Sequence, residues 1–340
     1  MSEIAIIGAG AWGTALSIVL GRKGTHKIRL WAHEQEVCES IAQRRANERF
    51  LPGQPIPTSV TPCNDLADAL DGAAIVVSVM PSQHCRHLFE RMRSHLNPEG
   101  MIVSATKGLE ENSLLRMTEV IVQMLTSDWK RPPRIGALSG PSFALEAARG
   151  DPTAITIASQ DTDLARTVQQ EFSAASFRIY TNDDPVGVEL GGALKNTIAI
   201  AAGVCAGLGL GHNSVAALIT RGLAEMTRLV VACGGKAETM AGLAGLGDLV
   251  LTCTGGLSRN RSVGVELGRG RQLPEVLAGM HGMVAEGIFT TTAAVGLARA
   301  RGVEMPITEQ MHAILHQGKS PRDAIYELMS RSGKSETIRA

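Results

Sequence analysis

The first half of the chain alternates short apolar runs with longer segments in which apolar residues recur at helical spacing. Each short run is almost continuously apolar, which is typical of strands buried on both faces of a parallel sheet. The predicted strands are Ile4–Ile7, Lys27–Trp31, Ile75–Val79, Met101–Ala105, Arg134–Leu138, Ala154–Ala158 and Phe177–Tyr180. Helices are predicted between them at Glu34–Arg44, Ser82–Met92 and Asn112–Leu125. This alternation predicts an α/β domain with a doubly wound, mostly parallel sheet.

The pattern changes at the sequence "YTNDDPVGVEL". Asp183, Asp184 and Pro185 combine capping side chains with a proline, which is typical of the start of a helix. Beyond this point the hydrophobic positions have helical spacing and no convincing run of strands follows. The longest such segments are Ser214–Ala232, Thr291–Arg301 and Thr308–His316. We therefore predict two domains, an α/β domain over residues 1–181 and an all-α domain over residues 182–340.

A glycine-rich turn follows the first predicted strand, in "IAIIGAGAWGTAL". Gly8, Gly10 and Gly13 have the spacing G-x-G-x-x-G, between a strand and a helix. The first glycine permits a tight turn, the second lets a pyrophosphate approach the backbone, and the third lets the helix pack on the strand. The free N–H groups of the helix N-terminus would hold the phosphates. The pattern predicts dinucleotide binding by a Rossmann-type domain.

The end of the second strand departs from the usual dinucleotide pattern. An acidic residue there normally binds a ribose 2′-hydroxyl, but this chain has Trp31, Ala32 and His33, with Glu34 one position late. His33 could contact a 2′-phosphate, or it could be an ordinary histidine of a surface loop. The sequence therefore allows NADP and does not exclude NAD.

Two further polar groups follow predicted strands. Lys107 comes directly after a strand in "VSATKGLE", and Gly140 and Ser142 follow another in "ALSGPSFALEAA". Ligands of open α/β sheets bind beyond the carboxyl ends of the strands, where these residues are expected. Alternatively, Lys107 is a solvated surface charge and Ser142 caps the next helix.

The segment "ELGGALKNTIAIAAG" carries a lysine inside an apolar helix. Between Leu190 and Thr220 the only formally charged side chain is Lys195. Burial disfavours the charged form of a lysine and lowers its pKa toward the range useful for acid–base catalysis, whereas a nearby carboxylate acts in the opposite direction. The alternative is a lysine whose long side chain reaches out to solvent.

The segment "GLAGLGDLVLTCTGGLSRNRSVG" supplies candidate partners for this lysine. Asp248 follows a glycine-rich turn, and Thr252 shares its helical face four residues later. Ser258, Arg259 and Asn260 then stand at a predicted helix start, where a guanidinium, a hydroxyl, an amide and free N–H groups suit a phosphate. The alternative is that Asp248 caps a helix and Arg259 lies on the surface. Together with Lys195, these groups favour hydride transfer to a phosphorylated ketone.

Composition excludes several other classes of protein. The chain has 340 residues, no formal net charge and 3% aromatic residues, which argues against nucleic-acid binding. Its six cysteines form no Cys-x-x-Cys pair, so no metal site is indicated. The apolar run "TIAIAAGVCAGLGLG" is shorter than a membrane span and rich in glycine. The N-terminus lacks the positive charge of a signal peptide. We expect a cytoplasmic protein without a membrane span.

These motifs resemble those of the bacterial NAD(P)-dependent glycerol-3-phosphate dehydrogenases. The resemblance runs from end to end of the chain, and its most specific parts are the "GALKN" helix and the stretch from Asp248 to Asn260. It implies a dinucleotide-binding domain and a helical domain with the active site between them, NAD or NADP as cofactor, and a homodimer. The other matching segments are "GAGAWGTAL", "ATKGLE", "SGPSFA", "LITRGLAEM" and "GVEMPIT".

The resemblance also implies roles for individual residues. Lys195 is similar to the family's proton donor and acceptor, with Asp248 and Thr252 as its supporting neighbours. Lys107 matches a position that contacts both cofactor and substrate. The other positions that match substrate contacts are Gly140, Ser142, Ser258, Arg259 and Asn260. Those that match cofactor contacts, beyond the three glycines, are Ala11, Trp12, His33, Ala144, Arg259, Val284 and Glu286. Some members of the family have an arginine where this chain has Ala32 and His33, so the resemblance does not fix a preference for NADP.

Two alternatives stay open at this point. A related 2- or 3-hydroxyacid dehydrogenase or a ketopantoate reductase would keep Lys195 but would need a site for a carboxylate, which the segment Ser258–Asn260 does not favour. A non-catalytic NAD(P)-sensing protein could retain the fold, but it would have no need of Lys195 and Asp248.

Overall fold

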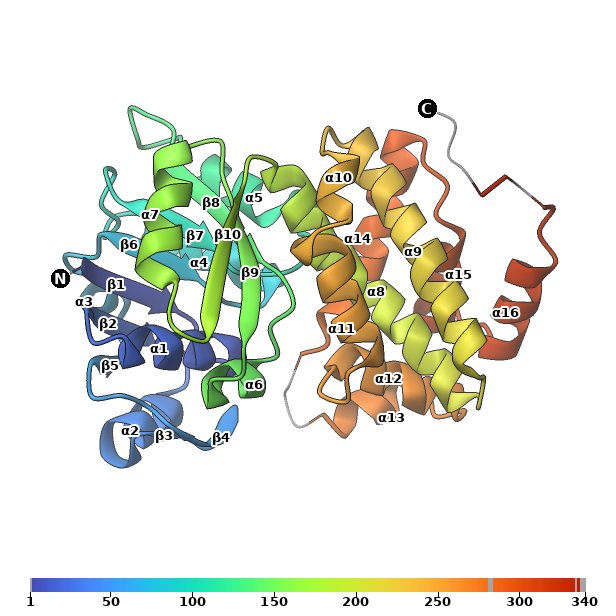
Figure 1. The fold of residues 1–340 in the computed structure, drawn as a ribbon, viewed down its shortest axis with the longest axis horizontal. Coiled ribbons are helices and arrows are strands. Elements are labelled where there is room, and N and C mark those ends of the chain that lie inside the picture. Colours follow the sequence, from blue (N-terminus) through green and yellow to red (C-terminus); the bar gives the residue numbers. More distant parts are fainter. Residues whose placement is uncertain (1, 281–283, 334, 337–340) are drawn as a thin grey trace.

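The computed structural model describes residues 2–280, 284–333 and 335–336. Two parts of the molecule lie side by side, an α/β domain that contains the N-terminus and a helical domain (Figure 1). The last strand of the sheet ends at Asn182 and the first helix of the helical domain begins at Pro185. The division into residues 1–181 and 182–340 remains a prediction, with the change in secondary structure close to its boundary.

The α/β domain is built on an eight-stranded sheet with the order β10-β9-β8-β7-β6-β1-β2-β5. All neighbouring strands are parallel except β8 and β9, which confirms the mostly parallel sheet. Because β1 lies between β2 and β6, the strand order reverses at β1, where ligands of such sheets bind. The strands are β1 Ser2–Ile7, β2 His26–Trp31, β5 Val60–Cys63, β6 Ile75–Ser78, β7 Met101–Ser104, β8 Arg134–Ser139, β9 Thr153–Ala158 and β10 Phe177–Asn182.

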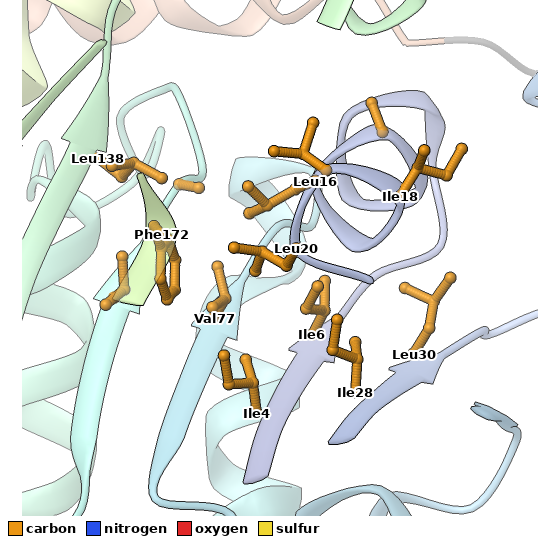
Figure 2. Close-up of a cluster of buried hydrophobic side chains, with 14 of the residues drawn as sticks. Ile4, Ile6, Leu16, Ile18, Leu20, Ile28, Leu30, Val77, Leu138 and Phe172 are labelled. Atoms are coloured by element: carbon orange, nitrogen blue, oxygen red, sulfur yellow. The ribbon is translucent and has the colours of Figure 1, made fainter. Parts of the chain in front are cut away.

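Helices cover both faces of this sheet, so that successive residues of β1 enter different cores. Ile4 and Ile6 pack with Leu16 and Leu20 of α1 in one core, part of which is shown in Figure 2. Ala5 and Ile7 lie in the second core, with residues of α4 and α5. This burial on two faces explains the continuously apolar strands. The helices are α1 Ala11–Arg22, α2 Gln35–Arg44, α3 Leu66–Leu70, α4 Cys85–Met92, α5 Met117–Leu125, α6 Ala144–Arg149 and α7 Thr162–Phe172.

The helical domain is organised around α8, Pro185–Gly207, which is almost entirely buried. Glycines let α12 approach it closely: a Cβ on Gly203 would lie 2.0 Å from the carbonyl oxygen of Arg261. As expected from the capping pattern, Asp184 accepts the N–H of Gly187 at the start of α8. The remaining helices are α9 His212–Ala232, α10 Ala237–Met240, α11 Asp248–Thr254, α12 Arg259–Gly268, α13 Leu273–Ala278, α14 Glu286–Arg301, α15 Pro306–His316 and α16 Pro321–Met329.

Among the described residues, α8 alone is long and apolar enough to span a membrane by itself. The segment from α10 to α11 together with α12 reaches the same length and hydropathy only if the two parts, bent by 48°, are counted as one span. However, α8 is packed inside the helical domain. A core helix of a globular domain has the same length and composition as a membrane span, so its apolar surface is accounted for by packing.

The structure corrects several expected boundaries. Helix α5 begins at Met117 rather than Asn112, because residues 112–116 form a tight loop in which Leu114 has φ +60°. Three short strands were not expected: the edge strand β5 and the hairpin strands β3, Ala46–Asn47, and β4, Leu51–Pro55. They lack a strand-like hydrophobic pattern, and β4 and β5 contain proline. The segment before Asp248 is a π-helical turn, η2 Leu243–Gly247, and not an open glycine-rich turn.

Candidate active site

The glycine-rich turn has the shape that dinucleotide binding requires. Gly8 has φ +124°, which L side chains rarely adopt. A Cβ on Gly13 would lie 1.9 Å from the carbonyl oxygen of Gly8, so only glycine lets α1 approach the end of β1. A Cβ on Gly10 would meet nothing within 4 Å, which leaves open space beside the first turn of α1, where Ala11 is the first residue. The turn therefore fits a pyrophosphate at a helix N-terminus.

The other candidate residues for the cofactor lie around this turn. Trp12 is half-buried in α1, with its ring 6.3 Å from that of Phe177, and Ala144 is the first residue of α6, which packs on α1. His33 is exposed after β2, and its ring lies 5.9 Å from that of Trp31. Asn47, which the sequence analysis missed, donates from Nδ2 to the carbonyl oxygen of Ala9 at 2.8 Å and so holds the turn from the β3–β4 hairpin.

Four polar side chains from both domains meet around the carboxylate of Asp248. Lys195 Nζ donates to Asp248 Oδ1 at 2.6 Å and to Thr252 Oγ1 at 2.7 Å. Lys107 Nζ donates to Asp248 Oδ2 at 2.7 Å. One carboxylate therefore binds two lysines, one from each domain. The side chain of Asp248 is 1% exposed and that of Lys195 8% exposed, so the cluster is shielded from water.

The hydrogen bonds fix how Lys195 is oriented. Thr252 Oγ1 donates its own hydrogen to the backbone carbonyl of Asp248 at 2.6 Å, so it must accept from Lys195. An ammonium has three N–H donors, and Asp248 and Thr252 occupy two of them. No described residue accepts the third, which can donate to a ligand oxygen. In the neutral amine the lone pair takes that place and can accept a proton.

Burial shifts the acid strength of this lysine. Desolvation and the charge of Lys107 together lower the pKa of Lys195 to about 8, despite the opposing attraction of Asp248. The sequence analysis predicted both opposing effects. An amine with this pKa can give and take a proton near neutral pH. The alternative of a lysine that reaches out to solvent is wrong, because Lys195 is 6% exposed.

The turn after β8 supports Lys107. Gly140 has φ +142°, and its carbonyl oxygen accepts hydrogen bonds from Lys107 Nζ at 3.1 Å and from Ser142 Oγ at 3.0 Å. Lys107 is thus not a free surface charge. Ser142 does not cap α6 with its side chain, because its hydroxyl donates back to Gly140 and Phe143 occupies the cap position.

The N-terminus of α12 lies in the same domain as Lys195. Ser258 caps it by accepting the N–H of Arg261, a capping role that the sequence analysis did not assign to this serine. Asn260 is buried and links three helices: Nδ2 donates to Asn196 Oδ1 at 3.0 Å and Oδ1 accepts the N–H of Gly287 at 3.0 Å. Asn196 was missed by the sequence analysis, although a polar residue beside Lys195 in an apolar helix was a signal.

Arg259 and Glu286 lie close enough to interact electrostatically. Arg259 is exposed, as the surface alternative expected, but neighbouring protein atoms still lower the pKa of its guanidinium by desolvation, against the attraction of Glu286. Glu286, the first residue of α14, accepts hydrogen bonds from Ser82 N at 3.2 Å and Ser82 Oγ at 2.6 Å. Val284 is half-buried just before α14. Ser82 gave no signal in the sequence, because its partner lies 204 residues away.

The residues described by the structure include no group of three or more histidine, cysteine or acidic side chains that could hold a metal ion. The polar groups of the candidate site are instead lysines, an arginine, two carboxylates, hydroxyls and amides. Such a set suits proton transfer and the binding of anions.

Comparisons with known proteins match both domains. The family model described as "NAD-dependent glycerol-3-phosphate dehydrogenase N-terminus" matches residues 3–165, and the model of the C-terminus of the same enzymes matches residues 184–326. The chain belongs to the NAD-dependent glycerol-3-phosphate dehydrogenase family. The expected family, the class of NAD(P)-linked oxidoreductases and the dinucleotide cofactor are thereby confirmed.

Individual members of this dehydrogenase family are similar over the whole chain. A glycerol-3-phosphate dehydrogenase of Koribacter versatilis is 69% identical over 99% of both chains. One of Acidobacterium capsulatum is 57% identical over 99% of this chain and all of the relative. A crystal structure of the enzyme from Coxiella burnetii is 42% identical, with a TM-score of 0.92 over 97% of this chain and 99% of that one. The Rossmann-type and helical domains are those expected.

Proposed function

We propose that this chain catalyses the reversible reduction of dihydroxyacetone phosphate by NADH or NADPH to sn-glycerol 3-phosphate. The product is the backbone of glycerophospholipids, so the reaction supplies phospholipid synthesis. The observation that carries the proposal is the buried cluster of Lys195, Asp248 and Thr252, which leaves one N–H of Lys195 for a substrate oxygen.

The cluster has the chemistry that reduction of a ketone needs. When bound, the nicotinamide supplies a hydride to the carbonyl carbon. Lys195 gives its third proton to the carbonyl oxygen as negative charge develops there, and becomes a neutral amine. Lys107 places a second positive charge beside Asp248, 2.7 Å from its carboxylate. Stabilisation of the developing charge by such fixed groups in a site shielded from water is usually the largest contribution to catalysis. In the reverse reaction neutral Lys195 takes the proton of the alcohol.

The phosphate of the substrate is assigned to the N-terminus of α12. Arg259 supplies a guanidinium and Asn260 a buried amide, next to the free N–H groups of the first helical turn. Ser258 Oγ caps the helix as an acceptor, and its own hydrogen can still donate to a phosphate oxygen. We assign Gly140 and Ser142 to the edge of the same site through Lys107.

The experiment that tests the proposal follows the loss of reduced-nicotinamide absorbance with dihydroxyacetone phosphate, with NADH and with NADPH. Ketopantoate serves as the control ketone. Turnover of the phosphorylated ketone alone is expected. Turnover of ketopantoate instead would assign the chain to the alternative reductase, and no turnover with either ketone would favour an NAD(P)-sensing protein. The ratio of the rates with NADPH and NADH gives the cofactor preference of the enzyme.

We further propose that the protein is a cytoplasmic homodimer, the arrangement implied by the resemblance of its sequence motifs. Size-exclusion chromatography with light scattering measures the mass directly. Twice the chain mass of 35.9 kDa is expected, and a mass equal to that of a single chain at micromolar concentration would contradict the dimer.

A further inference from the structure

A loop of the α/β domain, residues 107–116, is embedded in the helical domain. Leu109 is fully buried in the core of the helical domain, in the same cluster as Leu190 and Leu194 of α8. Leu114 packs against Gly296 of α14, where a Cβ would lie 3.0 Å from Leu114 Cδ2. Leu114 also has φ +60°, a conformation that costs energy for a leucine and persists only where its surroundings hold it. The neighbouring domain therefore holds these two leucines, while Gln83 and Arg86 of the loop's own domain hold its middle through Leu109 O and Glu110.

Both ends of this loop are held by charged groups of the helical domain. At its start, Lys107 Nζ donates to Asp248 Oδ2 at 2.7 Å. At its end, Arg116 Nη1 donates to Glu189 Oε2 at 2.6 Å. Glu189 and Lys195 both belong to α8, and Lys195 binds Asp248. Helix α8 thus holds one end of the loop directly and the other end through the catalytic carboxylate.

Glu189 binds more than Arg116. Its Oε1 accepts the backbone N–H of Thr118 at 2.9 Å, and its Oε2 accepts the hydroxyl of Thr118 at 2.5 Å. The carboxylate of Glu189 thus caps α5, a helix of the other domain, where a negative charge is stabilised by the free N–H groups. The side chain is 6% exposed, so these bonds are little weakened by water.

We propose that Glu189 is a positioning residue for Lys107, through the loop of residues 107–116. This proposal rests on the proposed function and extends it to a residue outside the cluster of Lys107, Lys195, Asp248 and Thr252. Glu189 fixes the end of the loop against α8, so that the start of the loop delivers Lys107 to Asp248. Small displacements of a catalytic group have large effects on rate, so loosening the far end of the loop lowers turnover.

Another buried carboxylate supplies a matched control. Glu225 of α9 accepts the N–H groups of Ile307 and Thr308, at 2.6 and 3.2 Å, and the hydroxyl of Thr308 at 3.2 Å. It therefore caps a helix in the same way as Glu189, with similar burial. However, its partners lie within the helical domain and outside the loop. A carboxylate that only stabilises the fold should behave like Glu225.

The experiment compares Glu189→Gln and Glu225→Gln in the wild-type enzyme and in the Lys107→Ala variant. We expect both glutamine variants to lower the melting temperature. Only Glu189→Gln should lower kcat/KM for dihydroxyacetone phosphate, by about tenfold. In the Lys107→Ala enzyme the same substitution should change kcat/KM by less than about twofold, because residues that act through one another are not additive.

A second measurement does not depend on turnover. Hydrogen–deuterium exchange of residues 107–116 should become faster in Glu189→Gln and stay unchanged in Glu225→Gln. An equal effect of Glu189→Gln with and without Lys107, unchanged kcat/KM, or unchanged exchange in the loop would each overturn the positioning role. Absence of turnover in the wild-type enzyme would instead refute the proposed function, and exchange would then decide whether Glu189 holds the loop.

Discussion

The two sides of the candidate site are built by different means. On the cofactor side the backbone forms the site, because Gly8 and Gly13 stand where a Cβ does not fit and Gly10 leaves open space. On the other side charged side chains form it, because Lys195 and Asp248 of the helical domain meet Lys107 of the α/β domain. The first side is sensitive to volume and backbone conformation, and the second to charge and hydrogen bonding. Substitutions should therefore fail for different reasons on the two sides.

The largest effect is expected for Lys195→Met. Methionine is close to lysine in size and apolar, so it suits the buried position, but it cannot donate a proton. Turnover should fall by about 10²-fold or more, as is usual when general acid–base catalysis is lost. Binding of NAD(P)H, measured by quenching of protein fluorescence, should be retained. A variant within about tenfold of the wild-type rate would refute the role of Lys195.

A pair of alanine substitutions tests the opposite side. Gly13→Ala places a Cβ 1.9 Å from the carbonyl oxygen of Gly8 and should lower the free energy of unfolding by about 1–3 kcal/mol. Gly10→Ala has space for its methyl group and should fold normally, but the methyl occupies the place of the pyrophosphate. We expect its dissociation constant for the cofactor to rise about tenfold, which corresponds to about 1.4 kcal/mol. Urea unfolding measures the stability of both variants, and titration measures their affinity for the cofactor. An equal loss of stability in Gly10→Ala and Gly13→Ala would contradict the different space found at the two glycines.

Arg259→Ala tests the assignment of the phosphate. The guanidinium lies at the N-terminus of α12, and hydrogen bonds to charged groups contribute about 1.5–3 kcal/mol, so the KM for dihydroxyacetone phosphate should rise at least about tenfold. Steady-state kinetics at saturating cofactor measure this change. Arg271→Ala is the matched control, because this exposed arginine pairs with Glu266 and is not a residue of the candidate site. An unchanged KM would place the phosphate elsewhere.

The smallest effect is the dependence on pH. Since the pKa of Lys195 is lowered to about 8, the proton donor is present below that pH and is lost above it. The kcat/KM for ketone reduction should therefore fall as the pH rises through about 8, whereas that for alcohol oxidation should rise. Profiles recorded in both directions on the free enzyme test the sign. A break only near the ordinary pKa of lysine would mean that Lys195 is hydrated in solution.

The parts of the fold that local patterns encode were predictable. Apolar runs predicted seven strands, capping residues predicted the start of α8, and glycine spacing predicted the turn after β1. Each of these signals lies within a few consecutive residues of the chain. The edge strand β5 and the loop before α5 were not, because their residues obtain their conformation from contacts with distant segments. Lys195 stood out because one charge in an apolar helix is conspicuous in any sequence.

The sequence by itself determined which residues have unusual chemistry: the glycines after β1, the lysine inside α8, and Asp248 with Thr252 on one helical face. Only the tertiary structure decided how they act together. Lys107 and Asp248 are 141 residues apart, and their hydrogen bond exists because the loop of residues 107–116 enters the helical domain. The lowered pKa of Lys195 likewise depends on burial and on distances to other charges. Both quantities arise from the packing of two domains, and spacing along the chain does not contain them.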